Sequence, residues 1–152
     1  MAVHDHRGEI ENLLYLYAER IDAGDFGGVA DLFAHAEILP PGAEEGARGR
    51  EAVLEMYQST TRLYEEGTPR TKHLVTNPII HVADSEERAE ARSYFTVLQA
   101  TPGIPLQPII AGRYEDQFER VEGVWRFFQR RMLPEFFGDL SQHLLLNVEE
   151  LT

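Results

Sequence analysis

The stretch from residue 109 to residue 132 most constrains what this chain can fold into, because it reads as one long β-hairpin. Glu122 and Gly123 stand between two runs rich in aromatic and β-branched residues, and a Gly-containing pair in that position predicts a tight turn. A turn there sets the register of the two strands. The register pairs Phe118 with Phe127, Glu119 with Arg126, Glu115 with Arg130, and Tyr114 with Arg131.

The predicted register gives the hairpin two different faces. One face carries mainly charged side chains in pairs of opposite sign, which suit a solvated surface. The other is apolar near the turn but becomes polar farther away, where it carries Tyr114, Asp116, Gln129 and Arg131. An inward face that becomes polar is typical of a small-molecule cavity. Side chains that reach solvent at a frayed sheet end would give the same pattern, and the residues alone leave both interpretations open.

Length and composition limit the number of domains and the kinds of partner. The 152 residues suffice for one domain, residues 1–152, with a single core. Acidic residues outnumber basic ones by 26 to 14, and the resulting net charge of −12 argues against nucleic acids and anionic membranes as partners. The absence of cysteine excludes disulfides, thiolate nucleophiles and cysteine-based metal sites. Residues 1–7 lack the apolar core of a signal peptide, and no apolar run is long enough to span a membrane, so we expect a cytoplasmic protein.

The spacing of apolar residues predicts helices first and strands afterwards. Helices followed by strands indicate an α+β fold, with helices packed on one side of a mainly antiparallel sheet. The predicted helices are residues 9–21, a short helix that Asp25 caps and that runs to Phe33, and residues 50–61; the predicted strands before the hairpin are residues 73–82 and 90–100.

Two segments lie outside these elements. Residues 40–49 read as a polar loop that begins with proline and ends with glycine. The tail from Leu133 carries large apolar side chains among few charges, and that apolar surface must be covered. We expect the tail both to close the open end of the sheet and to contribute to a subunit interface.

Asp22 and His73 are the strongest candidates for chemistry. Asp22 stands in the last turn of the first predicted helix, where the helix dipole disfavours a negative charge; this position invites a partner, although an ordinary turn aspartate would look the same. His73 opens a strand, on the face that strict alternation shares with Val75, Asn77 and Ile79, although a hydrogen-bonded core or surface histidine would look the same. A carboxylate bound to one ring nitrogen of a histidine fixes its tautomer and stabilises the imidazolium, which suits the other nitrogen for proton transfer.

Other polar side chains are candidates for ligand binding, but none suggests a metal ion. Strict alternation also places His81 on the face of His73, but eight residues of extended strand span about 26 Å, too far for the two to share a metal. His35 and His143 are isolated in the sequence, and we predict no metal site. Arg131 suits an anion or a developing oxyanion, and an ordinary salt-bridge partner would look the same. The tyrosines that could donate hydrogen bonds into a cavity, or simply pack, are Tyr17, Tyr57, Tyr94 and Tyr114.

A family resemblance rests on four segments: residues 17–26 (YAERIDAGDF), 70–77 (RTKHLVTN), 112–120 (GRYEDQFER) and 123–127 (GVWRF). In this order they resemble the SnoaL-like branch of the nuclear transport factor 2-like superfamily, and the resemblance covers nearly the whole chain. It implies a cone-shaped, cystatin-like α+β barrel, in which a curved and mainly antiparallel sheet wraps around the N-terminal helices and leaves an apolar pocket. It also implies a homo-oligomer, either a trimer or a dimer.

Within that branch the chain is similar to the scytalone dehydratases and the hexachlorocyclohexane dehydrochlorinases, which use an Asp-His dyad as a base for eliminations. Asp22 and His73 fall on the dyad positions, and Arg131 lies near a basic pocket residue of the latter group. Two departures stand out. Residues 90–100 offer no second pocket histidine, and Thr71 stands where the dehydrochlorinases have a pocket cysteine.

Residues and resemblance together predict a cofactor-independent lyase or isomerase that acts on a small, mostly apolar, cyclic or aromatic molecule. His73 would abstract a proton, Asp22 would orient it, and Tyr57, Tyr114 or Arg131 would stabilise negative charge. The alternative is a non-catalytic binder or assembly subunit, similar to the small subunit of ring-hydroxylating dioxygenases. A dyad that water can reach favours the enzyme, whereas a dyad packed shut favours the subunit.

Overall fold

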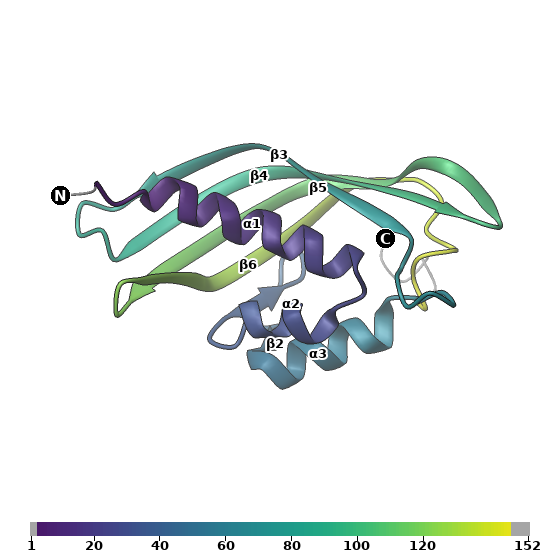
Figure 1. Ribbon diagram of the computed structural model, residues 1–152, viewed down its shortest axis with the longest axis horizontal. Helices are drawn as coiled ribbons and strands as arrows, with labels where there is room; N and C mark the ends of the chain where they lie inside the picture. Colours follow the sequence, from purple (N-terminus) through teal and green to yellow (C-terminus); the bar gives the residue numbers. More distant parts are fainter. Residues whose placement is uncertain (1–2, 147–152) are drawn as a thin grey trace.

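The computed structural model describes residues 3–146, which form three helices and one six-stranded sheet (Figure 1). The predicted α+β class is confirmed, and every predicted helix and strand is present within a few residues of its expected bounds. The elements are α1 (His6–Asp22), α2 (Phe26–Leu32), β1 (Glu37–Leu39), β2 (Ala47–Arg48), α3 (Gly49–Thr60), β3 (Thr71–Val82), β4 (Arg88–Thr101), β5 (Ile104–Val121) and β6 (Val124–Phe137).

The sheet has the strand order β2-β1-β6-β5-β4-β3. Strands β3 to β6 pair antiparallel in chain order, whereas β1 runs parallel to β6. The sheet curves around α1 as expected, but it does not close, because β2 and β3 remain as edges (Figure 1). Strands β1 and β2 were not predicted, since they are three and two residues long and β1 depends on a partner far along the chain.

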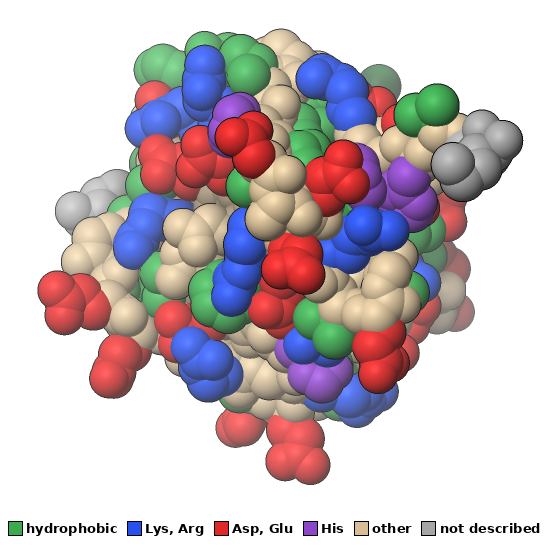
Figure 2. All heavy atoms as spheres, turned by 90° about the vertical axis from the view of Figure 1, so that its left-hand side faces the viewer, with side chains coloured by type: hydrophobic (Ala, Val, Ile, Leu, Met, Phe, Trp, Pro, Cys, Tyr) green, Lys and Arg blue, Asp and Glu red, His purple; other side chains and the backbone are tan. Residues whose placement is uncertain are grey.

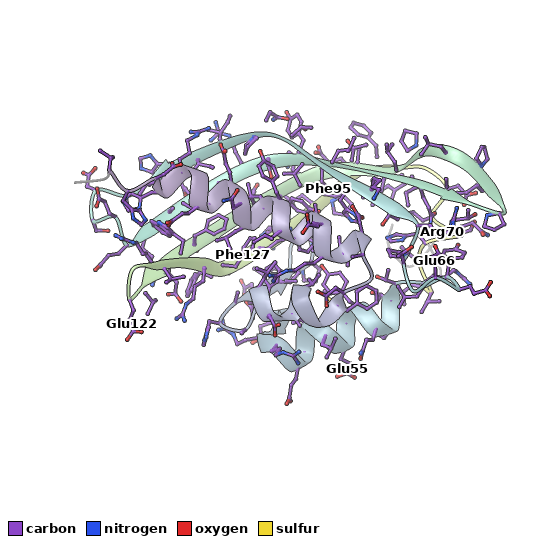
Figure 3. All side chains as sticks on the ribbon, viewed as in Figure 1. Glu55, Glu66, Arg70, Phe95, Glu122 and Phe127 are labelled. Atoms are coloured by element: carbon purple, nitrogen blue, oxygen red, sulfur yellow. The ribbon has the colours of Figure 1, made fainter. Side chains whose placement is uncertain are left out.

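Helix α1 supplies the side of the core that faces the sheet. Asp5 caps its first turn by accepting a hydrogen bond from the backbone N–H of Gly8 at 2.9 Å. The helix buries one face, which includes Ile10, Leu14, Tyr17 and Ile21 and packs with aromatic side chains of the sheet. In Figure 3, Phe95 and Phe127 lie in the middle of the molecule, Glu122 lies at the hairpin turn, and Glu66 and Arg70 lie at the opposite end.

The β5–β6 hairpin turns where the sequence predicts, but its register changes partway along. Glu122 and Gly123 both have positive φ, as a tight hairpin turn requires, and the predicted pair Phe118 and Phe127 is confirmed. Between that pair and Gln117, which pairs with Gln129, strand β6 holds one extra residue, Phe128. Beyond this bulge the predicted pairs are wrong: Glu115 faces Arg131 instead of Arg130, and Tyr114 faces Met132 instead of Arg131.

The bulge exchanges the faces of β6, because alternation restarts after the extra residue. Arg130, predicted on the solvated face, is fully buried opposite Asp116. Gln129 and Arg131, predicted inward, line a hollow of about 240 Å³ on the outer face of the sheet together with Glu115 and other outward side chains. Asp116 is buried, so the interpretation of a frayed sheet end is wrong for this residue.

A second irregularity lies in β3. The register with β4 shifts between Thr76 and Ile79, where Asn77 adopts a positive φ of 43°. The predicted alternation therefore fails beyond this point. His81 is exposed and lines the outer hollow, whereas the largely buried His73 faces α1, so the two histidines do not share a face.

The tail closes one end of the sheet, as expected. Strand β6 continues to Phe137, and the turn that follows buries Leu140. Leu144 forms a bridge with Thr61 at the end of α3. Phe136 is 73% exposed, and its place in a subunit interface stays a prediction. The rest of the tail, residues 147–152, lies outside the described residues.

The surface of the described residues carries both signs of charge. Figure 2 shows acidic and basic side chains interspersed, with histidines among them, on the end of the molecule where α1 begins. None of the described helices combines the length and the apolar character that a bilayer crossing needs.

Candidate active site

Asp22 and His73 meet where the end of α1 reaches the start of β3. The Nδ1 atom of His73 lies 2.6 Å from Oδ1 of Asp22. Because a carboxylate only accepts hydrogen bonds, Nδ1 carries the proton and donates it. The backbone N–H of His73 and the hydroxyl of Thr71 also donate to Asp22, both at 2.8 Å. Three donors thus offset the unfavourable position of this carboxylate at the end of a helix.

This geometry fixes the tautomer of His73. With Nδ1 bound to Asp22, Nε2 is the nitrogen that remains to accept a proton. The two side chains are 8% and 10% exposed, so they are shielded from water but not sealed. Asp22 and Thr71 also line a surface hollow of about 300 Å³, together with Arg70 and Lys72.

Three of the four predicted tyrosines lie inside the fold beside this pair. The hydroxyls of Tyr17 and Tyr57 are 2.6 Å apart, and the ring of Tyr17 packs edge-on against the rings of His73 and Tyr114. Burial raises the pKa of all three hydroxyls above the usual value, so they stay protonated at neutral pH. The site therefore contains neutral hydrogen-bond donors next to the imidazole.

Arg130 and Asp116 form a buried ion pair on the other side of these tyrosines. The guanidinium donates two hydrogen bonds to the carboxylate, at 2.7 and 3.0 Å, and both side chains are fully buried. Burial raises the pKa of Asp116, although Arg130 opposes the effect. For Arg130, burial would lower the pKa, but Asp116 and the neighbouring tyrosines raise it above the ordinary value, so the guanidinium stays charged.

The same guanidinium stacks on aromatic rings and keeps one nitrogen without a partner. Its central carbon lies 3.7 Å from the ring centroid of Tyr114 and 4.4 Å from that of Tyr17. The Nη1 atom is buried and makes no hydrogen bond to the described residues. An unpaired charged donor inside an aromatic cluster suits a ligand oxygen or a developing negative charge.

Two predicted site residues lie elsewhere. Tyr94 is on the outer face of β4 and is 55% exposed, so the expectation that it points into the cavity is wrong. Arg131 donates to the backbone oxygens of Pro40 and Ala43, at 3.1 and 2.9 Å, instead of lining the interior. The bulge at Phe128 explains this difference, since it directs Arg130 inward in place of Arg131.

His143 is a buried neighbour of the dyad that the sequence did not reveal. It lies in the tail, is 8% exposed, and its Nδ1 has no partner among the described residues. Burial lowers its pKa to about 4, and the electrostatic influence of the neighbouring His73 adds to the lowering. Only the tertiary fold brings the tail to the dyad, so no local pattern could have indicated this proximity. Among residues 3–146, no three His, Asp or Glu side chains lie close enough together to hold a metal ion.

Comparisons with known proteins agree with this architecture. The family model described as a SnoaL-like domain matches residues 3–131. A candidate scytalone dehydratase from Novosphingobium aromaticivorans is 27% identical, with a TM-score of 0.67 over 88% of this chain and 86% of that one. LinA is 23% identical, with a TM-score of 0.67 over 89% of both chains. A protein of the same Novosphingobium species, described as NTF2-like with a cystatin-like fold, is 20% identical, with a TM-score of 0.68 over 84% of this chain and 80% of that one. A search of curated protein sequences found no match.

Proposed function

The chain belongs to the SnoaL-like domain family, and from this premise we propose that it is a cofactor-independent lyase or isomerase. Its substrate would be a small, mostly apolar, cyclic or aromatic molecule that loses a proton to His73. The observation that carries the proposal is the 2.6 Å hydrogen bond between His73 Nδ1 and Asp22, which leaves Nε2 as the base.

The proton transfer follows from this arrangement. Nε2 of His73 takes a proton from a substrate carbon, and Asp22 stabilises the imidazolium that forms. The electron pair of the broken C–H bond either expels a leaving group from the adjacent carbon or is delocalised and reprotonated elsewhere. General base catalysis of this type contributes about a hundred- to ten-thousandfold in rate.

The buried donors would stabilise the negative charge that develops on the substrate. Tyr17 and Tyr57 remain protonated and hydrogen-bond to each other beside His73, and Arg130 supplies a positive charge across the ring of Tyr17. Donors fixed before the reaction cost no reorganisation when charge appears, which is the usual origin of electrostatic catalysis. The resemblance to a candidate scytalone dehydratase supports an elimination in particular.

The dyad is tested with His73→Gln and Asp22→Asn. We expect both variants to fold and to lose turnover of the substrates that the wild type converts, because each removes the base or its orienting partner. The ring of His73 should also titrate differently in Asp22→Asn when followed by NMR, and cyclic ketones, phenols or halogenated rings should perturb its signals in the wild type. Turnover retained by His73→Gln would refute the proposed role.

A second candidate function is a non-catalytic binder or assembly subunit. The shielding of the dyad supports this alternative, because a buried Asp-His pair also serves as a structural hydrogen bond. On that interpretation His73→Gln lowers stability, and the wild type turns over nothing in the panel. A His73 signal that changes in Asp22→Asn but responds to none of the ligands would favour this candidate.

A further inference from the structure

The tail places a second imidazole next to the dyad. Gln99 of β4 is the cross-strand partner of Thr71, whose hydroxyl donates to Asp22. The side-chain amide of Gln99 donates to the backbone oxygen of Gln142 at 3.1 Å, and His143 follows directly. Two buried residues thus connect the dyad to the tail, which lies at the same end of the molecule as the end of α1 (Figure 1).

Several further bonds hold His143 in place. Its backbone oxygen accepts from the N–H of Arg62 at 2.8 Å, and its own N–H donates to Leu140 at 3.1 Å. The N–H of Leu145 donates to Thr60 at the end of α3 at 2.9 Å. The backbone on both sides of His143 is therefore fixed, and its side chain is buried without a partner for Nδ1. A buried polar atom without a hydrogen-bond partner destabilises the fold, and its presence calls for a compensating ligand or role.

We propose that His143 is the oxyanion-binding residue of this site, and that the substrates are carbonyl compounds with an acidic C–H bond next to the carbonyl. The inference rests on the proposed function of the dyad. His73 Nε2 takes the proton from the carbon, the C–H electron pair becomes the enolate double bond, and the charge moves to the carbonyl oxygen. A ring N–H of His143 donates a hydrogen bond to that oxygen and keeps its proton. The protonated His73 then returns a proton to carbon, and no other reactant is needed.

The protonation state of His143 fits this role. Burial and the neighbouring His73 lower its pKa to about 4, so the imidazole is neutral at physiological pH, while Asp22 opposes the effect. A neutral imidazole polarises a carbonyl by hydrogen bonding, because its own N–H is a very weak acid. The division of labour between the histidines follows from their partners: His73 has a carboxylate to stabilise its charged form, whereas the only polar contacts described for His143 are made by its backbone.

The test is hydrogen exchange into 2-tetralone and cyclohexenone in heavy water, followed by proton NMR at pH 7. The variant His143→Phe keeps a planar ring but removes the donor, whereas His143→Asn places an amide close to the position of Nδ1. We expect the wild type to accelerate exchange over buffer, His143→Phe to lose at least about a hundredfold, and His143→Asn to recover part of that loss. In the wild type, the ketone should also shift the ¹⁵N signals of His143.

The outcomes separate this inference from the proposed function. Wild-type exchange by His143→Phe, with exchange abolished in His73→Gln, overturns the role of His143 and leaves the dyad intact. Wild-type exchange by His73→Gln overturns both. A wild type that exchanges neither ketone and shows no shift at His143 overturns the assignment of carbonyl substrates, while the dyad is still judged by the titration of His73. If His143→Phe does not fold, the ¹⁵N shift in the wild type and the exchange by His143→Asn decide.

Discussion

Replacement of His143 by asparagine should remove a large part of the acid sensitivity of the fold. The pKa of His143 is about 4 in the folded chain, against an ordinary value of 6.5. Between these pH values the unfolded chain binds more protons, so acid favours unfolding; the stabilising contribution is complete above pH 6.5 and is lost as pH falls through 4. The gap corresponds to about 3 kcal/mol, of which about 2 kcal/mol falls between pH 7 and pH 5.

Urea unfolding at pH 7 and pH 5 measures this difference. The fluorescence of Trp125, the single tryptophan of the chain, reports the unfolding of the core in which it is buried. We expect the free energy of unfolding to fall by about 2 kcal/mol less for His143→Asn than for the wild type over this pH interval. The exposed His35 provides the matched control, since His35→Asn should follow the wild type.

Carboxylates elsewhere titrate in both proteins, so their effects cancel in the comparison. The titratable groups that act on His143 are His73 of β3 and Asp22 of α1, and both are unchanged in the variant. An equal loss of stability in wild type and His143→Asn between pH 7 and pH 5 would refute the reasoning, because it would mean that the folded chain does not hold this imidazole neutral.

Three further predictions concern the core, the turn beside the dyad and the outer face. Arg130→Met should lower the urea-derived free energy of unfolding by about 3–5 kcal/mol, because it leaves the Asp116 carboxylate buried and uncompensated, and adding Asp116→Leu should restore most of it; additive losses would contradict this account. Gly24→Ala should lower the thermal midpoint and alter the titration of His73, since φ is 74° and a Cβ would lie 2.0 Å from the oxygen of Gly67; an unchanged midpoint would show that the turn relaxes freely. Sedimentation should give a dimer or trimer for the wild type and a smaller species for the double variant Tyr94→Ser and Phe136→Ser. Both exposed rings line one outer hollow, and exposed apolar surface of this kind favours a subunit interface. An unchanged mass of the variant would exclude this face as the interface.

Local patterns account for most of what the sequence predicted. The α1 stripe, the Asp25 cap and the Glu122-Gly123 turn are signals that neighbouring residues carry by themselves, so the class and order of the elements follow from them. Asp22 could be identified from the sequence because the helix dipole disfavours a negative charge in the last turn of a helix. The structure places its compensating partners, Thr71 and His73, within hydrogen-bond distance.

The wrongly predicted strand faces have a common physical cause. The face of each side chain was predicted from strict alternation along the strand, and one extra residue in a bulge reverses that alternation. One extra residue, Phe128, was enough to turn Arg130 into the interior and Arg131 out of it. The register shift near Asn77 likewise turned His81 to the outer face of the sheet. The inserted residue Phe128 is neither glycine nor proline, so nothing in the sequence indicates the bulge in β6. In β3, Pro78 lies within the register shift and is a signal that the prediction of an unbroken strand overlooked. The proximity of His143 to the dyad depends on contacts between segments far apart in the chain, and no periodicity records such contacts.

The buried pair of Arg130 and Asp116 bears on the choice between enzyme and subunit. Apolar residues of similar volume often replace a buried ion pair at no cost in stability, so stability alone gives little reason for its presence. The pair lies against Tyr114 and Tyr17, and Tyr17 in turn packs on His73, so a charge is fixed one ring away from the base. A structural subunit would gain nothing from this arrangement. In an active site, by contrast, the fixed positive charge stabilises negative charge that develops on a substrate, without any movement of protein groups during the reaction. The buried ion pair therefore supports the proposed catalytic function over the alternative of a structural subunit.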